Sequence, residues 1–486
     1  MAWEVVIGLE CHVQLKTRSK MFCGCPNSFG AEPNTHVCPV CLGLPGALPR
    51  TNARAIEYAL RLGVALGCRI APESVFARKN YFYPDSPKNY QVSQYDRPLC
   101  VGGSLPIAVD GERHAVPLTR IHCEEDAGKS FHPERHGDRR LSRVDFNRAG
   151  VPLLELVTEP VLRSPEQCSV FLTALRRLVR WLGISDGDME KGQLRCDANV
   201  SIRPVGATTL GTKTELKNLN TIKGVERGVT AEIARQVEIV SGGGRITQAT
   251  LLYDADRDRL AIMRSKEHAH DYRYFPEPDL PVLRVSEAET AAARARAPEL
   301  PWAREARFRD GLGLTPYDAS VLTQSRELSD YLEELIAQGV SPKSASNWVS
   351  SQLLRYEGTA WRDVSDLRSR FAPPRAFATL ISRVESVSVT ATAAKGMLEE
   401  VMMRGADPNT LFVTGGAPAI SGDAMLRPLV RAVLAEHASV ADQVLAGDAR
   451  PFGFLVGQVM KKSAGQAVPQ EVQRLLREEL AARGRS

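Results

Sequence analysis

The spacing of the apolar residues changes near residue 288, and this change limits what the chain can fold into. Before it, short alternating segments such as Val5–Leu9 and Leu153–Val157 are separated by Gly and Pro, as in β-strands. After it, apolar residues recur every three or four positions, as in Ser329–Ile336, which is typical of helices. We therefore predict an α+β domain followed by an all-helical part.

The chain is long enough for several domains. Its 486 residues exceed one ordinary hydrophobic core. The stiff extended segment Pro276–Pro281 is expected to close the first domain, and Gly415–Pro418 is expected to mark a second joint. We predict domains at residues 1–290, 291–410 and 411–486. A secretory signal and a run of about eighteen apolar residues are both missing, so we expect a cytoplasmic protein with no membrane segment.

The ten residues Ile121–Ser130 allow two opposite interpretations. Their Gly-Lys-Ser ending suggests a nucleotide phosphate loop, but that loop needs an earlier glycine where Cys123 stands. The acidic residues Glu124, Glu125 and Asp126 would repel a phosphate bound in such a loop. Carboxylates and substrate phosphates commonly share a Mg²⁺ ion. The segment therefore predicts a Mg²⁺ site more than a phosphate loop.

Four cysteines form two close pairs with twelve residues between them: Cys23, Cys25, Cys38 and Cys41. Two such pairs suit tetrahedral Zn²⁺, because each tight turn can direct both sulfurs at one ion. Buried or free thiols are the alternative, although an intracellular chain favours metal binding over disulfides. We predict a zinc knuckle at residues 23–41. A closed four-sulfur site leaves no position for substrate, so its expected role is folding or RNA docking.

Metal-binding groups recur at alternate positions of two expected strands. Glu10 and His12 are two residues apart, so both project from one face of their strand. The same spacing separates Asp197 from Asn199. Oxygen and nitrogen ligands of this kind suit Mg²⁺ together with phosphate. Taken singly, a solvated strand face would explain them as well, and that alternative stays open.

Two segments interleave aromatic residues with charge: Arg78–Asp85 and Asp271–Asp279. Aromatic rings beside basic groups suit base stacking combined with phosphate contact. A surface loop packed on the core, or a rigid pocket wall, would have the same composition. The residues alone thus indicate phosphate chemistry without choosing a substrate.

Read in order, these segments resemble one family, the B subunit of bacterial and organellar aspartyl/glutamyl-tRNA amidotransferases (GatB). The end of the chain, Phe452–Lys461, resembles the YqeY-like tail of that family. The resemblance extends over nearly the whole length of the chain. The other segments that carry it are Gly8–Leu15, Arg78–Asp85, His122–Lys129, Arg195–Asn199, Glu215–Asn220 and Asp271–Leu280.

The resemblance implies a catalytic cradle of antiparallel sheet with helices, then a helical domain and a helical tail that grips tRNA. It implies that ATP and Mg²⁺ are used to phosphorylate the side-chain carboxylate of misacylated Glu-tRNA(Gln) or Asp-tRNA(Asn). Ammonia then displaces the phosphate. A GatA-type amidase subunit would supply the ammonia, and a GatC-type small subunit would complete a heterotrimer. The chain itself has no Ser-Ser-Lys amidase signature, which makes such a partner necessary.

The resemblance also implies residue roles. Mg²⁺ contacts are expected for Glu10, His12 and Glu125. Glu124, Asp197 and Glu215 are expected as further members of the catalytic site, and Lys79 and Tyr83 as substrate or phosphate contacts. In the tail, contacts with tRNA are expected for Lys461, Lys462, Arg474 and Arg477. A solvated helical surface would carry the same charge as the tail. A zinc-containing tRNA-binding protein with a structural acidic face is the non-enzymatic alternative.

Overall fold

The computed structural model describes residues 2–131, 141–265, 272–354, 373–386, 389, 391–404, 406–414 and 420–484. The joint predicted at Gly415–Pro418 and the first residue of Asp271–Asp279 lie outside these ranges. The chain forms two compact units, Met1–Trp302 and Ala303–Ser486. The three domains expected from the sequence, with their two boundaries, stay predictions.

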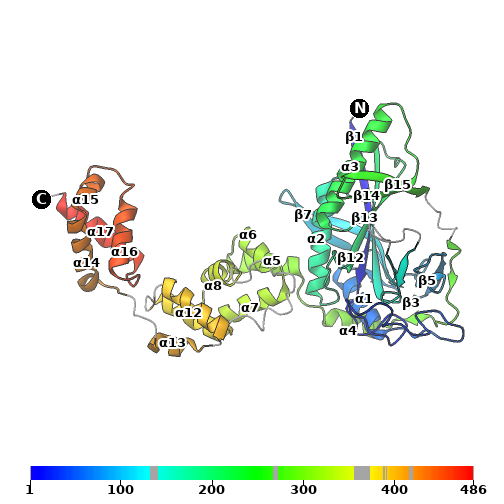
Figure 1. Ribbon diagram of the computed structural model, residues 1–486, viewed down its shortest axis with the longest axis horizontal. Helices are drawn as coiled ribbons and strands as arrows, with labels where there is room; N and C mark the ends of the chain where they lie inside the picture. The colour runs from blue at the N-terminus through cyan, green and yellow to red at the C-terminus, as the bar shows by residue number, and fades with distance from the viewer. Residues whose placement is uncertain are drawn as a thin grey trace. The chain divides into compact units, whose positions relative to one another are not determined.

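A ten-stranded sheet forms the centre of the first unit, with the strand order β15-β14-β13-β12-β1-β11-β8-β6-β2 and β7 paired to β8 (Figure 1). All neighbours are antiparallel except β13 and β14. Helix α3 (Ile222–Ser241) joins these two strands, and a parallel pair needs such a crossover. The strands are β1 (Trp3–Gln14), β2 (Arg69–Ile70), β6 (Cys100–Val101), β7 (Ser104–Val109), β8 (Glu112–Glu125), β11 (Pro152–Thr158), β12 (Leu194–Pro204), β13 (Thr214–Leu219), β14 (Ala249–Asp254) and β15 (Arg259–Ser265).

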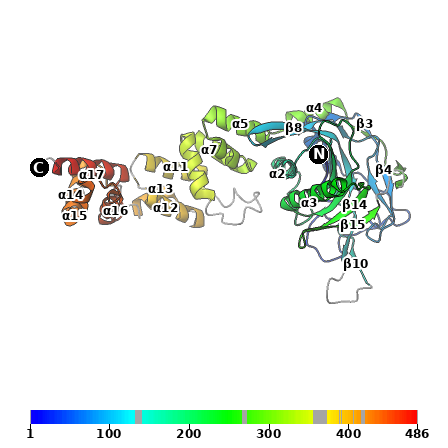
Figure 2. The same ribbon diagram turned by 90° about the horizontal axis from the view of Figure 1, so that it is seen from above.

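The central strand β1 has two unlike faces. Leu9, Cys11 and Val13 are fully buried, whereas the residues between them, Glu10 and His12, are half-buried on the other face. The apolar face belongs to the main core, which also holds residues of α2 (Pro165–Trp181). Figures 1 and 2 show α2 and α3 side by side along the sheet. The polar face of β1 is thereby left for a site.

Smaller elements of the first unit surround the sheet. The three-stranded sheet β16-β4-β5 joins the two aromatic segments, because Phe275 of β16 pairs with Arg78 of β4. Helix α1 contacts α4. The bounds are α1 (Ala53–Ala65), α4 (Glu287–Ala295), β3 (Glu73–Ser74), β4 (Ala77–Asn80), β5 (Tyr90–Ser93), β9 (Lys129–Phe131), β10 (Arg143–Asp145), β16 (Phe275–Pro276) and β17 (Leu283–Arg284).

The described part of the second unit is helical, apart from an isolated bridge between Ile420 and Ala467. One core gathers around Phe308, Leu332 and Phe377, and another gathers around Leu426 and Leu475. The elements are α5 (Pro301–Leu312), α6 (Pro316–Leu322), α7 (Arg326–Ala337), α8 (Pro342–Trp348), the π-helical η2 (Val349–Leu353), α11 (Pro374–Glu385), α12 (Ala391–Arg404), α13 (Pro408–Thr414), α14 (Asp423–Glu436), α15 (Ala438–Leu445), α16 (Phe452–Lys462) and α17 (Pro469–Arg483).

The predicted α+β class is confirmed, with helices at the C-terminal end as expected. Within the described ranges, no helix is long and apolar enough to cross a membrane.

Candidate functional site

Strand register brings charged side chains together on the polar face of the sheet. Glu155 of β11 lies opposite His12 of β1 on one side and opposite His122 of β8 on the other. Arg195 of β12 lies opposite His12 on the other side of β1, away from β11. Directly opposed residues share a face of the sheet, so four strands that are distant in sequence contribute to one site.

The tightest cluster is formed by His12, Glu124 and Glu155. The Nε2 atom of His12 lies 3.4 Å from Oε1 of Glu124 and 3.5 Å from Oε2 of Glu155. One ligand atom from each of the three residues lies within 4.8 Å of the others. Burial by itself would lower the pKa of His12, but Glu155 and Glu124 raise it to about 9. An imidazole and two carboxylates held this closely can bind a divalent cation.

A cavity of about 400 Å³ lies over this cluster. Its walls combine acidic groups, which suit a metal ion, with basic groups, which suit phosphate oxygens. The charged residues that line it are His12, Lys79, Asp85, Glu124, Asp126, Arg148, Arg195, Asp197 and Lys217. This arrangement can hold a cation and a polyanion side by side.

Two carboxylates hold the basic groups in place. Asp126 Oδ2 accepts a hydrogen bond from Nη2 of Arg195 at 2.7 Å and lies 3.6 Å from Nε of Arg148. Asp197 Oδ2 accepts one from Nζ of Lys217 at 2.6 Å. Burial would lower the pKa of Lys217, but Asp197 and Glu215 together hold it above its ordinary value. Asp197 and Glu215 thus lie beside Lys217 in the structure.

Glu10 and Glu125 have other partners. Oε1 of Glu10 accepts a hydrogen bond from Nδ2 of Asn199 at 2.8 Å. Glu125 forms an ion pair with Lys88 and accepts the backbone N–H of Val92 at 3.0 Å, in a small recess beside the cavity. Among the described residues, the cation-sized cluster therefore contains neither of them. The metal roles expected for both stay predictions.

Lys79 belongs to the cavity lining, whereas Tyr83 does not. Burial would lower the pKa of Lys79, but the acidic groups around it, Tyr274, Glu124 and Glu155, raise it above its ordinary value. The ring of Tyr83 lies 5.9 Å from that of Tyr81, which lines the cavity. The structure therefore brings Lys79 into the candidate site, and Tyr83 contacts a residue that lines it.

Sequence reasoning missed Glu155. Its signal was present in Leu153–Val157, where one carboxylate interrupts an apolar strand. A buried carboxylate needs partners, so a single Glu in a buried run indicates a specific site. Asp126 belongs to the acidic run singled out in the sequence, but no role was predicted for it.

The four predicted zinc cysteines meet in the structure. One sulfur from each of Cys23, Cys25, Cys38 and Cys41 lies within 4.8 Å of the others. A hydrogen bond from Cys23 is the largest cause that lowers the pKa of Cys41 to about 4, and Lys20 contributes to it. Nζ of Lys20 lies 3.7 Å from the Cys41 sulfur. Zinc binds thiolates, so this donor set fits the ion.

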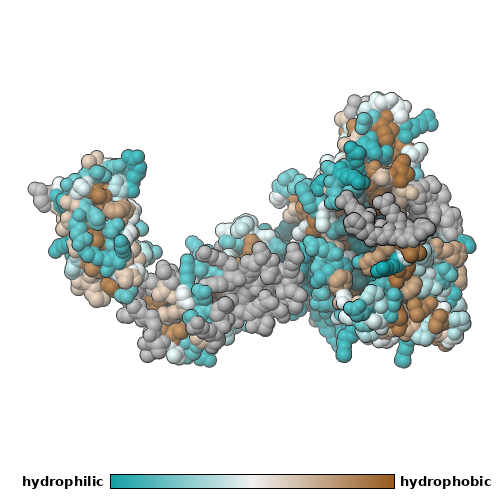
Figure 3. Space-filling view, viewed as in Figure 1, coloured by the Kyte–Doolittle hydropathy of each residue, from teal (hydrophilic) through white to brown (hydrophobic). Residues whose placement is uncertain are grey.

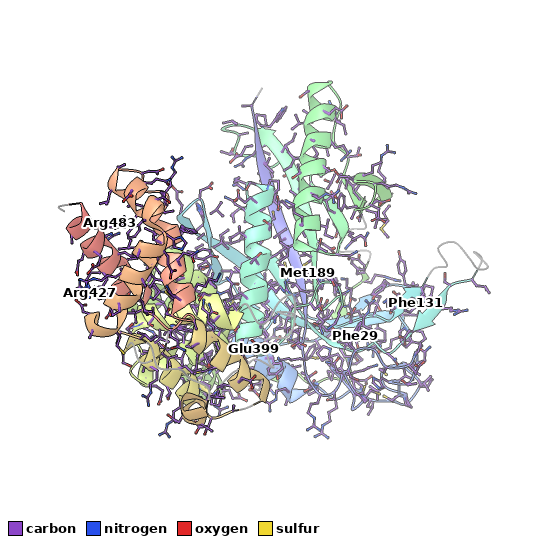
Figure 4. The ribbon with its side chains drawn as sticks, turned by 60° about the vertical axis from the view of Figure 1, so that its left-hand side comes forward. Phe29, Phe131, Met189, Glu399, Arg427 and Arg483 are labelled. Atoms are coloured by element: carbon purple, nitrogen blue, oxygen red, sulfur yellow. The ribbon has the colours of Figure 1, made fainter. Side chains whose placement is uncertain are left out.

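Two of the four tail residues predicted to contact tRNA form ion pairs within the protein. Lys462 pairs with Glu436, while Arg474 pairs with Asp423 and donates to Oε1 of Glu478 at 2.7 Å. The Arg477 guanidinium lies 5.4 Å from the Phe452 ring centroid, and Lys461 is exposed. The tail's other charged groups include Arg427 and Arg483, labelled in Figure 4.

The sheet, its charged cavity and the helical C-terminal part define a protein of the GatB type. A family model described as the GatB/GatE catalytic domain matches residues 5–291. A second, described as the GatB domain, matches residues 330–480. The chain therefore belongs to the GatB family, and the resemblance seen in its motifs is confirmed.

Relatives of similar length share one name, which is that of the B subunit of aspartyl/glutamyl-tRNA(Asn/Gln) amidotransferase. The protein of Moorella thermoacetica is 47% identical over 99% of this chain and 100% of its own. That of Carboxydothermus hydrogenoformans is 46% identical over 99% of both chains. That of Geobacter sulfurreducens is 45% identical over 99% of this chain and 100% of its own. The chain is thus one component of an enzyme, an amidotransferase.

Proposed function

We propose that this chain activates and amidates the side-chain carboxylate of Asp or Glu misacylated onto tRNA. A carboxylate oxygen attacks the γ-phosphorus of ATP, and the bond to ADP breaks. Ammonia then attacks the carbonyl carbon, inorganic phosphate leaves, and the new amide nitrogen loses a proton. The observation that carries this proposal is the His12–Glu124–Glu155 cluster, whose His12 and Glu124 line one cavity together with Lys79, Arg195 and Lys217.

The residues of the cavity suit phosphoryl transfer, which depends on positioning and charge neutralisation more than on covalent help. Lys79 and Arg195 can donate hydrogen bonds to the anionic oxygens of the transferred group. Asp126 orients Arg195 by accepting its hydrogen bond at 2.7 Å. The aminoacyl carboxylate, itself an anion, can approach the same basic wall.

Two metal roles are proposed. His12, Glu124 and Glu155 would hold Mg²⁺. The family resemblance implies metal roles for Glu10 and Glu125 as well. When bound, Mg²⁺ supplies charge neutralisation for the phosphates. The cysteine quartet would hold Zn²⁺ in a closed structural site.

The relatives' name describes one component of a larger enzyme. We propose a GatA-type amidase as the source of ammonia and a GatC-type small subunit as the third chain. Misacylated tRNA is the proposed macromolecular substrate, gripped by the tail, and the cytoplasm is the proposed location.

The test is transamidation by the reconstituted complex. Purified complex is incubated with ATP, glutamine and each misacylated tRNA, and the amino acid released from the tRNA is identified. Glu124→Gln should lower transamidation by about 10²–10³-fold while glutamine hydrolysis by the partner is kept, because only charge stabilisation in this chain is lost. Glu125→Ala is expected to abolish transamidation in the same way. Full transamidation by Glu124→Gln would overturn the site.

Deletion of residues 411–486 tests the tail. We expect weaker binding of tRNA with ATP hydrolysis less affected, because the cavity lies in the other unit. Unchanged affinity for tRNA would remove the tail from the proposed binding surface.

A further inference from the structure

Aromatic rings from two distant segments form a group beside Lys79. Tyr95 and Tyr274 stack with centroids 4.2 Å apart and an angle of 7° between the rings. Tyr272 meets Tyr274 edge to face at 6.1 Å. Hydrophobic side chains gather in this part of the first unit, near β3 and β5, in Figure 3. The function proposed above leaves these rings without a role.

The backbone that carries Tyr272 and Tyr274 is rigidly fixed. Arg78 donates two hydrogen bonds to Glu277, each 2.7 Å long. Nδ2 of Asn80 donates to the carbonyl oxygens of Tyr272 at 3.2 Å and Arg273 at 2.9 Å. These contacts accompany a left-handed φ of 45° at Arg273, a conformation that a non-glycine residue rarely adopts. The rings are therefore positioned before any ligand binds.

The ring group adjoins Lys79, which lines the cavity. Nζ of Lys79 lies 5.1 Å from the ring centroid of Tyr272. The pKa of Tyr274 is raised to about 12, first by burial and then by Glu155 and Glu124, although Lys79 opposes the rise. Tyr274 thus lies close enough to Glu124 and Glu155 for their charges to affect its pKa. A ligand anchored at Lys79 can extend over these rings.

Part of the Tyr95 side chain is accessible to solvent. One face is covered by Tyr274, yet 43% of the residue stays exposed. A tyrosine needed only for packing would bury more of its ring, whereas a stacking platform must leave one face accessible. Nucleobases stack on such accessible aromatic rings in many nucleic-acid-binding sites.

We propose that the Tyr95–Tyr274 pair stacks an adenine base whose phosphate or ester end lies in the cavity beside Lys79. This inference rests on the proposed function, because both substrates named there carry adenine. The base belongs either to ATP or to the 3′-terminal adenosine of the tRNA. Both have the same chemistry at the platform, a flat base attached to a ribose and an anionic group.

The experiment compares Tyr95→Ala, Tyr95→Phe and the exposed control Tyr317→Ala in the reconstituted complex. Tyr317 is 76% exposed and lies on α6, outside the ring group. If ATP supplies the base, Tyr95→Ala should raise the Kd for ATP by roughly tenfold, as loss of about 1.4 kcal/mol of stacking predicts. Binding of inorganic triphosphate, which has no base, should not change. Tyr95→Phe should bind ATP like the wild type, since it keeps the ring.

If tRNA supplies the base, Tyr95→Ala should leave the Kd for ATP unchanged. It should instead raise the KM for misacylated tRNA about tenfold at constant kcat, for the same loss of stacking. It should also reduce the preference for a 3′-terminal A over a 3′-terminal C. Either set of results supports the platform and identifies the source of the base.

Three outcomes overturn the platform. The first is unchanged binding of both substrates by Tyr95→Ala. The second is an equal loss of ATP and inorganic triphosphate, which would indicate general damage to the cavity. The third is the same loss in Tyr317→Ala. If the wild-type complex shows no ATP-dependent transamidation, the proposed function fails, whereas an active wild type with an unaffected Tyr95→Ala removes only the platform.

Discussion

Charged side chains are arranged in opposite ways in the sheet and in the C-terminal helices. His12, Glu124 and Glu155 come from three strands and converge beneath one cavity, where both carboxylates are almost fully buried. Arg427 and Asp423, on α14, pair with each other on an exposed helical surface. Buried charges are expensive unless they are paired or bind a metal, whereas exposed pairs cost little and contribute little.

Charge composition alone therefore does not distinguish a functional site from an exposed surface. In the sequence, the basic residues of the tail outnumber its acidic ones, which made RNA contacts plausible there. In the structure, Arg474 and Lys462 pair with acidic residues of neighbouring helices. A carboxylate buried in an apolar strand, as Glu155 is, indicates function more strongly than an exposed basic helix does.

The largest effect is expected from Glu155→Gln. The change keeps the shape of the side chain but removes the charge that lies between His12 and His122. We expect transamidation to fall by about 10²–10³-fold and the affinity for Mg²⁺ to weaken. Steady-state kinetics over a range of Mg²⁺ concentrations would measure both effects.

Glu232→Gln is the matched control. Glu232 is also fully buried, but it accepts a hydrogen bond from Thr214 at 2.7 Å and pairs with Arg235, outside the cavity lining. Its substitution should lower stability while the Mg²⁺ dependence stays normal. Equal loss of activity in both variants would mean that buried charge in this unit is structural throughout.

Much of the fold could be predicted because its signals are local. Helix α16 spans Phe452–Lys462, where apolar residues recur at helical spacing, and Ser164 caps α2 ahead of Pro165, a pair typical of a helix start. The alternation of Glu10 and His12 along one strand is also local and was predicted. Periodicity and capping are read within a few residues, so one sequence is sufficient for them.

The partners within the site could not be predicted, because they depend on register between distant strands. Glu124 and Glu125 are neighbours in sequence, so their side chains project from opposite faces of β8. Only the pairing of β8 with β11 places Glu124 near Glu155 and His12. That pairing joins residues about thirty positions apart, so neither strand alone shows which side chains it brings together.

A smaller effect is expected from Cys38→Ser, which tests whether the cysteine quartet holds a metal. We expect the zinc content, measured by elemental analysis, to fall from about one ion per chain to near zero. The free energy of unfolding should fall by about 2 kcal/mol or more, since lost metal sites are among the larger destabilising changes. Cys168→Ala, at a buried cysteine outside the quartet, should keep its zinc. Absence of zinc from the wild type would favour free thiols.

The smallest effect concerns the ion pairs of the tail and their response to acid. The pKa values of Asp423, Glu478 and Glu479 are lowered, chiefly by hydrogen bonds from Arg474 and Arg431. A lowered pKa contributes stability that is complete above the ordinary value and is lost as the pH falls through the lower folded value. Protection of the α14 and α17 amides against hydrogen exchange should therefore be constant above about pH 5 and decrease below about pH 4.

Arg427→Met should reduce this acid sensitivity, because Arg427 forms ion pairs with all three carboxylates. Arg450→Met is the control, since Arg450 forms its ion pair with a near neighbour in the chain, Asp448, away from these carboxylates. Exposed pairs are weak, so Arg427→Met should be only slightly less protected than Arg450→Met near neutral pH. The two variants should converge in acid, where the carboxylates are protonated and the pairs are lost in both. A large loss of protection in Arg427→Met at pH 7 would show that the tail depends on these charges as strongly as the sheet depends on its buried cluster.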